Sequence, residues 1–159
     1  MSTHLRYVTG DATNPPGTGP RIIAHVCNDI GAWGRGFVTA LSRRGKEPEV
    51  AYRGWYRDRD RSGFALGAVQ LVPVHHALWV ANMIGQHGIR RAGGQPPIRY
   101  EALEEALGRV AIYALHLKAS VHMPRIGASL AGGDWQRIEP LIIDRLCGRG
   151  INVTVYDLP

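Results

Sequence analysis

Two glycine-rich stretches carry the residue types that bind phosphate. The first spans residues 28–36 (NDIGAWGRG) and the second residues 127–134 (GASLAGGD), and each follows an apolar run and precedes a helical pattern. Such a loop leaves backbone N–H groups unpaired and adds the positive end of a helix dipole, an arrangement that binds phosphate. Because α/β sheets hold ligands at the carboxyl ends of their strands, the two loops together predict a diphosphate site. The alternative is two tight turns whose glycines only supply positive φ, and neither loop matches a P-loop or a dinucleotide fingerprint.

Polar side chains stand at the entrance of the first loop: His25, Cys27, Asn28 and Asp29. His25 and Cys27 are two residues apart on a predicted strand and share a face, where they form either a metal pair or a thiolate–imidazole couple. No third or fourth ligand follows nearby at metal spacing, and a buried cysteine is usually inert, so we expect a structural pair and no metal. His75 and His76 lie on another predicted strand and point to opposite faces, which argues against chelation. Trp33 either lines a pocket or covers the core.

The basic residues are almost all arginines. There are 19 Lys and Arg against 13 Asp and Glu, which gives a formal charge of +6, and only Lys46 and Lys118 are lysines. This excess raises nucleic acid or another polyanion as a partner. However, only Arg35 and Arg125 adjoin the glycine-rich loops, so the charge also fits the approach of a small anionic ligand, and a nucleic-acid partner is not favoured. Because arginine does not deprotonate in proteins, lysine chemistry is confined to two positions.

Composition excludes several classes of protein. Hydrophobic residues make up 45% of the chain and charged residues 20%, as in globular proteins, and 159 residues fit one domain over 1–159. No apolar run approaches the roughly 20 residues of a membrane span, and residues 1–9 lack the apolar segment of a secretory signal. Two cysteines do not make a disulfide framework, so we expect a cytoplasmic location. No membrane association is expected, and the oligomeric state is left open with a monomer favoured.

Short apolar runs alternate with helical patterns along the chain. The predicted strands are residues 5–9, 21–26, 68–74, 78–84, 120–124 and 151–156. Helices are predicted at 34–44, 47–59 and 100–118, and a last helix carries Ile138, Leu141, Ile142 and Leu146 and stops at Gly148 and Gly150. Pro140 marks the first turn of that helix, after an irregular or 3₁₀ turn at 135–139. The alternation predicts an α/β sandwich with a mostly parallel central sheet.

Around these loops the sequence resembles the macrodomains, the family that binds ADP-ribose, over nearly its whole length. The resemblance rests on Gly10-Asp11, residues 24–29 (AHVCND) leading into Gly34-Arg35-Gly36, residues 123–127 (MPRIG) and residues 153–156 (VTVY). MPRIG with Trp135 eight residues after its glycine is similar to one branch. That branch includes the terminal ADP-ribose protein glycohydrolase and the yeast-type ADP-ribose-1″-phosphate phosphatase. The resemblance implies a three-layer α/β/α macrodomain with a mixed, mostly parallel central sheet.

The resemblance also implies a site map for ADP-ribose. Asp11 accepts a hydrogen bond from the adenine amino group, Tyr156 lies against the adenine face, and Asn28 bonds the distal ribose. The alternatives are a turn residue at Asp11 and a core aromatic at Tyr156. Backbone amides of the two loops hold the diphosphate, and Gln86 and His87 lie near the distal ribose. The implied ligand-binding residues are Asp11, Ala12, Asn28, Gly34, Arg35, Gly36, Gly127, Ala128, Ser129, Leu130, Ala131, Gly132 and Tyr156.

Two departures from the glycohydrolase bear on mechanism. Gln86 stands where that enzyme has its lysine nucleophile, and Ala131 stands where it has an aspartate. Neither side chain is a useful nucleophile or acid–base group, and neither lysine of the chain falls at that position, so a covalent lysine–ribose route is not expected. The nearest acids are Asp29 and Asp134, and Asp134 is interpreted as a helix or turn cap.

Three functions remain open at this point. The first is a hydrolase that releases ADP-ribose from esters, either modified acidic side chains or O-acetyl-ADP-ribose. The second is a phosphatase for ADP-ribose-1″-phosphate, and the third is a reader that binds ADP-ribose without chemistry. The candidate catalytic residues are His25, Asn28, Asp29 and Gln86, with Asn28 positioning the ribose and Asp29 orienting water. The expected partner is ADP-ribose or an ADP-ribosylated protein, with no cofactor.

Overall fold

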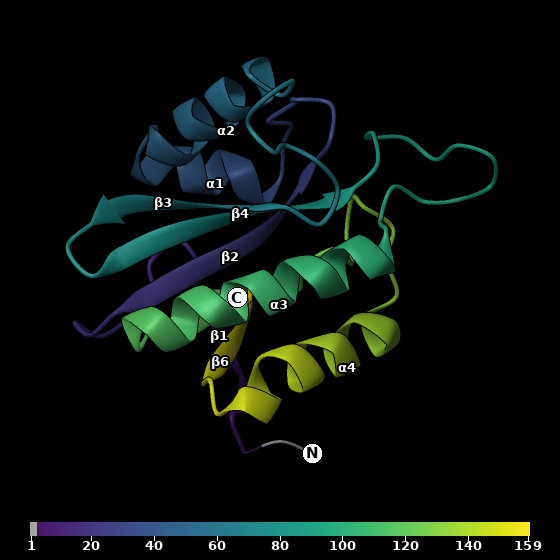
Figure 1. Ribbon diagram of the computed structural model, residues 1–159. Coiled ribbons are helices and arrows are strands. Elements are labelled where there is room, and N and C mark those ends of the chain that lie inside the picture. Colours follow the sequence, from purple (N-terminus) through teal and green to yellow (C-terminus); the bar gives the residue numbers. More distant parts are fainter. Residues whose placement is uncertain (1–2) are drawn as a thin grey trace.

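The computed structural model describes residues 3–159, which form a sheet of six strands between two helical layers (Figure 1). The strands are β1 (Leu5–Thr9), β2 (Arg21–Asn28), β3 (Val69–His75), β4 (Leu78–Gln86), β5 (Ser120–Met123) and β6 (Val153–Asp157). Their order across the sheet is β1-β6-β5-β2-β4-β3, and every neighbouring pair is parallel except β3 with β4. The fold is therefore the predicted three-layer α/β/α sandwich with a mixed, mostly parallel sheet.

The helices cover both faces of the sheet. Helices α1 (Phe37–Arg44) and α2 (Glu47–Arg57) lie on one face, and α3 (Tyr100–Leu117) and α4 (Trp135–Arg145) lie on the other (Figure 1). Alternate residues of β2 belong to two different buried clusters, with Ile22 and Ala24 in one and Ile23 and Cys27 in the other. Strand β2 reads as a nearly continuous apolar run because both of its faces are covered. Within the described residues, no helix is long and apolar enough to cross a membrane.

The carboxyl ends of β2, β4 and β5 lie at one edge of the sheet. Strand β2 pairs in parallel with both β5 and β4, so the segments that follow these three strands emerge side by side. The two predicted glycine-rich loops follow β2 and β5 and are therefore neighbours in space. A third segment, residues 87–99, follows β4 at the same edge.

The structure differs from the sequence prediction in the last helix. Helix α4 begins at Trp135, so residues 135–139 are helical, and Pro140 lies inside the helix instead of in its first turn. The start is fixed by Asp134, whose Oδ1 accepts a hydrogen bond from the N–H of Gln136 at 2.9 Å. Pro140 is exposed and removes only the single hydrogen bond to the carbonyl of Gln136. A smaller difference is that β3 ends at His75, so His76 lies in the following turn.

Candidate functional site

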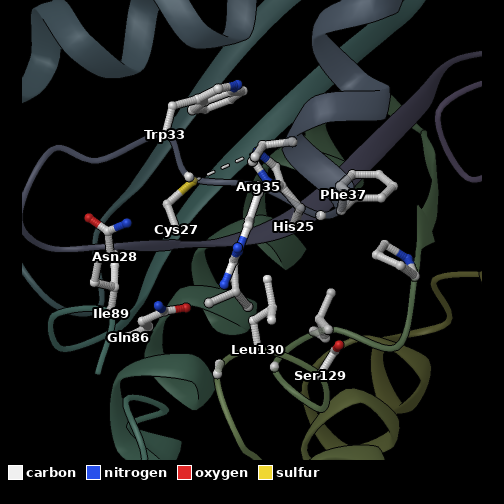
Figure 2. Close-up of a pocket in the computed structure, with 18 of the residues that line it drawn as sticks. His25, Cys27, Asn28, Trp33, Arg35, Phe37, Gln86, Ile89, Ser129 and Leu130 are labelled. Atoms are coloured by element: carbon white, nitrogen blue, oxygen red, sulfur yellow. Dashed lines mark hydrogen bonds between the residues drawn. The ribbon is translucent and has the colours of Figure 1, made fainter. Parts of the chain in front are cut away.

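A cavity of about 580 Å³ opens at the carboxyl ends of β2, β4 and β5, between the two glycine-rich loops (Figure 2). The structure brings together at this cavity most of the predicted site residues: His25, Asn28, Gly34, Arg35, Gly36, Gln86, Gly127, Ser129, Leu130 and Ala131. The predicted residues that do not line it are Asp11, Ala12, Asp29, His87, Ala128, Gly132 and Tyr156. The sequence therefore located the cavity through its two loops.

The side chain of Asn28 organises the first loop from within. Its Oδ1 accepts hydrogen bonds from the N–H groups of Ile30 (3.0 Å) and Ala32 (3.2 Å) and from the hydroxyl of Tyr52 (2.8 Å). Its Nδ2 donates to the carbonyl of Ala32. Tyr52 is fully buried, and its hydroxyl also lies 2.7 Å from the backbone carbonyl oxygen of Asn28, so its single proton is shared between the two acceptors. Since the amide oxygen already has three donors, Asn28 acts here mainly as the residue that shapes the loop.

The first loop presents unpaired backbone donors at the start of α1. Gly34 and Gly36 have φ values of 72° and 88°, which only glycine adopts readily. Gly36 is the N-cap and contributes no side-chain cap. Within residues 3–159, the N–H groups of Arg35, Gly36 and Phe37 have no hydrogen-bond acceptor. These donors and the helix dipole together make this end of the cavity attractive to an anion.

The second loop is closed more tightly. The N–H of Gly133 donates to the carbonyl of Gly127 at 2.7 Å, and the N–H of Gly132 donates to that of Ser129 at 3.0 Å. In the described part of the chain, the N–H groups of Ser129, Leu130 and Ala131 have no acceptor, and all three residues line the cavity. This loop therefore offers amides at its tip, while the first turn of α4 is capped by Asp134 and does not line the cavity.

His25 and Cys27 are buried side chains of β2 that carry no charge. The Nε2 of His25 bonds the Oδ1 of Asn82, while burial lowers the pKa of His25 to about 4 and raises the pKa of the Cys27 thiol. A neutral imidazole and a protonated thiol, 3.8 Å apart, carry no charge to attract each other. No group of three His, Cys, Asp or Glu within residues 3–159 could hold a metal ion. The imidazole packs against Trp33 and Phe37, which supports the structural interpretation of this pair.

Trp33 fulfils both of its predicted alternatives. Its ring is buried in the core on the α1 and α2 side of the sheet, and it also lines the cavity. The indole N–H donates to the hydroxyl of Ser42 at 2.8 Å, so the position of the ring is fixed by a polar contact as well as by packing.

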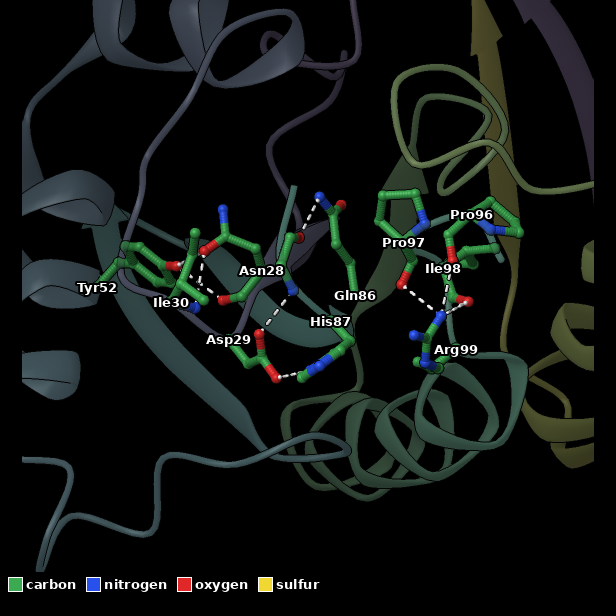
Figure 3. A network of polar contacts seen from close by, with 11 residues as sticks. Asn28, Asp29, Ile30, Tyr52, Gln86, His87, Pro96, Pro97, Ile98 and Arg99 are labelled. Carbon is green, nitrogen blue, oxygen red and sulfur yellow. Dashed lines mark hydrogen bonds and ion pairs between the residues drawn. The ribbon is translucent and has the colours of Figure 1, made fainter. Parts of the chain in front are cut away.

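Asp29 bridges two loops (Figure 3). It does not line the cavity. Its Oδ2 lies 2.7 Å from Nδ1 of His87, and its Oδ1 accepts the N–H of Gly88 at 2.8 Å. The carboxylate thereby ties the loop after β2 to the segment after β4. Gln86 does line the cavity, and its Nε2 donates to the carbonyl of Gly88 at 3.1 Å. Of these two predicted catalytic residues, only Gln86 faces the ligand space.

The residues assigned to adenine are engaged elsewhere. Asp11 accepts two hydrogen bonds from Thr13, at 2.9 and 2.7 Å, and pairs with Arg44 at 3.0 Å; the hydrogen bond from the Thr13 hydroxyl contributes most to lowering its pKa. Tyr156 is only 6% exposed, and its hydroxyl bonds Nδ1 of His122 at 2.7 Å. Burial lowers the pKa of His122 to about 4. The burial of Tyr156 and its hydrogen bond to His122 are those of a core aromatic, which is the alternative interpretation of this residue.

Sequence reasoning missed several residues of the cavity wall, including Phe37 and Val38 at the start of α1 and two residues of the segment after β4. Ile89 and Arg90 line it from the segment after β4. No motif distinguishes them, because their position depends on how residues 87–99 fold back, with the N–H of His87 bonded to the carbonyl of Pro97 at 2.8 Å. Arg35 and Arg90 have no carboxylate partner among residues 3–159, so two cationic side chains at the cavity remain available to an anion.

Comparison with known proteins agrees with this geometry. The chain is 60% identical to the macrodomain protein from Streptomyces coelicolor, whose structure it matches over 96% of this chain and 98% of that chain with a TM-score of 0.87. The chain belongs to the macrodomain family. It is also 37% identical to the mouse chromodomain-helicase-DNA-binding protein 1-like, over 99% of this chain but only 18% of that protein. No model of a protein family matches the chain.

A more distant structure shares the fold alone. The complex of DarTG from Thermosipho africanus with ADP-ribose is 18% identical, with a TM-score of 0.78 over 99% of this chain and 42% of that chain.

Proposed function

We propose that the cavity binds ADP-ribose, with the diphosphate between the two glycine-rich loops. The observation that carries this proposal is the convergence of unpaired backbone amides from both loops on one cavity. The uncapped start of α1 and the unpaired Arg35 and Arg90 add positive potential there. A volume of about 580 Å³ suits a nucleotide-sized ligand. Macrodomain membership, and the ADP-ribose found in the DarTG complex with the same fold, support the choice of ligand.

The finer proposal is that the chain hydrolyses esters of ADP-ribose without a lysine nucleophile. Water adds to the ester carbonyl, the bond from that carbon to the ribose oxygen breaks, and the ribose oxygen takes a proton. The products are ADP-ribose and a free carboxylic acid. An ester carbonyl develops negative charge on one oxygen, and an amide among those of Ser129, Leu130 and Ala131 that the diphosphate leaves free can stabilise that oxygen without any acid–base side chain. Gln86 lines the cavity and can orient the attacking water.

An assay on a protein carrying glutamate-linked ADP-ribose tests this activity. We expect release of ADP-ribose above the buffer rate, and no release from a serine-linked control, whose ribose bond contains no carbonyl for the amides to stabilise. Calorimetry with free ADP-ribose on the same preparation separates binding from chemistry. Binding without release from the glutamate ester leaves the hydrolase proposal without support.

One observation favours a reader as the second candidate. Among the described residues that line the cavity, the ionisable side chains are the arginines, Cys27 and His25. The pKa of His25 is about 4, which keeps this histidine neutral. No carboxylate or lysine lines the cavity there. Tight ADP-ribose binding with no turnover of either an ester or a phosphate would establish the reader.

The phosphatase is less favoured by the same contacts. His25 and Asn28 were its candidate residues, and His25 is buried against Trp33 while Asn28 is occupied by its own loop. Phosphate release from ADP-ribose-1″-phosphate, measured at equal protein concentration beside the glutamate ester, compares the two activities directly. A clear preference for the phosphate substrate would reverse this order.

A further inference from the structure

Arg125 has the edge of its guanidinium group bound to a carboxylate. Its Nε lies 2.7 Å from Oδ1 of Asp157, and its Nη2 lies 3.0 Å from Oδ2. This bidentate salt bridge joins the segment after β5 to the end of β6. Such a pair neutralises the charge of the arginine and uses the donors along one edge. Asp157 also fixes the plane of the guanidinium group, because both hydrogen bonds lie in that plane.

Two aromatic rings pack against the same guanidinium group. Its Cζ lies 5.0 Å from the ring centroid of Tyr7 and 5.3 Å from that of Trp135. These rings are themselves held edge to face, at 6.4 Å and 75°, and the Trp135 indole N–H donates to the Tyr7 hydroxyl at 3.0 Å. The Arg125 side chain is nevertheless 43% exposed, and it lines the cavity. With its edge paired to Asp157, Arg125 therefore brings to the cavity an oriented guanidinium group more than a free charge.

The other arginines of the cavity differ in this respect. Arg35 and Arg90 have no carboxylate partner in residues 3–159, so their hydrogen-bonding edges are free for phosphate oxygens. Arg125 is committed to Asp157 and is better suited to stacking than to anion binding. Guanidinium planes stack on aromatic bases, and ADP-ribose contains a single aromatic group, the adenine.

We propose that Arg125, held flat by Asp157, Tyr7 and Trp135, is the stacking surface for the adenine ring of the bound ligand. This inference rests on the proposed binding of ADP-ribose. It assigns the base to Arg125 in place of Tyr156, whose ring is buried and whose hydroxyl is bonded to His122. Specificity for an adenine-containing ligand over a bare sugar phosphate then depends on a residue of the MPRIG motif.

The substitution Arg125→Lys tests the proposal because it keeps the charge and removes the plane. Loss of one base-stacking contact predicts about tenfold weaker binding of ADP-ribose by calorimetry. In the wild type the adenine H2 and H8 protons of bound ADP-ribose should be displaced in the NMR spectrum, and in Arg125→Lys this displacement should shrink. Arg137→Lys is the matched control, because Arg137 stacks on Tyr100 at 3.8 Å but does not line the cavity; its affinity should equal that of the wild type.

Other outcomes are equally decisive. Unchanged affinity and unchanged adenine signals in Arg125→Lys would overturn the proposal, and so would weaker binding that alters only the phosphorus signals. Absence of ADP-ribose binding by the wild type would instead refute the proposed function. If Arg125→Lys unfolds at the assay temperature, Asp157→Asn carries the test: it retains the guanidinium but releases its edge, and both the adenine displacement and the affinity should fall.

Discussion

The two glycine-rich loops border the same cavity, yet they join their helices differently. Residues 28–36 lead into α1, and no side chain of the described residues caps its first turn. Residues 127–134 lead into α4, whose first turn is capped by Asp134. An anionic ligand would therefore meet a helix N-terminus at the first loop and only loop amides at the second.

The loops also differ in the space around their glycines. A Cβ added at Gly34 meets no atom within 4 Å, whereas one added at Gly133 would collide with the carbonyl oxygen of Gly127 and lie 2.9 Å from Cδ1 of Ile138. Gly34 requires glycine for its backbone conformation alone, and Gly133 requires it for packing. At Gly133 the second loop is thus a packed wall, while at Gly34 the first is an open rim, although Gly31 in the same loop packs against Tyr56. Substitutions at Gly133 and Gly34 should therefore have different consequences.

The largest expected effect concerns the strands that precede the loops, since β2 buries His25 and β5 buries His122. Both have a pKa of about 4 in the folded protein and close to 6.5 when unfolded, so the unfolded chain binds more protons between these values. Stability therefore falls as the pH is lowered. From pH 7 to pH 5 each histidine should cost about 2 kcal/mol of the free energy of unfolding, measured with urea.

Single substitutions separate the two histidines. His122→Gln and His25→Gln should each remove about half of this pH dependence, whatever they do to the stability at pH 7. Asp11 and Asp157 have lowered pKa values, so their protonation also reduces the free energy of unfolding as the pH falls, but mainly below pH 5. A free energy of unfolding that stays constant between pH 7 and pH 5 would contradict the burial of neutral imidazoles.

The next largest effect is expected for Gly133→Ala in the second loop. The added methyl group has no room beside the Gly127 carbonyl and Ile138, so the free energy of unfolding should fall by about 3 kcal/mol. Gly34→Ala is the comparison in the first loop: its side chain has space but its φ of 72° is strained, which should cost about 1 kcal/mol. Equal losses in chemical denaturation would remove the distinction between packed wall and open rim.

A smaller effect, on binding instead of folding, is expected for Gly34→Asp. Asp and Asn tolerate positive φ best after glycine, so the Asp and Asn variants at this position should fold alike. The carboxylate of the Asp variant would compete with the diphosphate for the unpaired amides at the start of α1. The affinity for ADP-ribose should therefore fall about tenfold, or ~1.4 kcal/mol. Gly34→Asn supplies the same shape without the charge, and a similar loss in both variants by calorimetry would argue for a steric cause.

The smallest effect is expected for Asp134→Ala. Loss of the N-cap of α4 should lower the free energy of unfolding by about 1 kcal/mol. ADP-ribose affinity should change little, because Asp134 does not line the cavity. Asp134→Ser, which can still accept the Gln136 N–H, should recover most of the stability. A large loss of affinity in Asp134→Ala would place the start of α4 in the binding site after all.

The sequence predicted the elements well because their patterns are local. Apolar runs with period two and stripes with helical period depend only on which face of an element is covered. The loop positions followed from the glycines between these elements. The start of α4 was wrong because the rule about proline in the first turn outweighed the capping signal of Asp134 one residue before the helix. The order of the strands across the sheet leaves no such local trace.

By itself the sequence therefore determined the fold class, the family resemblance and the two loops that border the cavity. Tertiary structure alone decided what each polar side chain is free to do. Asn28 is occupied because Tyr52 reaches it, Asp29 because His87 does, and Arg125 offers its plane because Asp157 takes its edge. These partners lie 24 to 58 residues apart in the chain. Periodicity says which face a residue occupies, but not which distant group will meet it there.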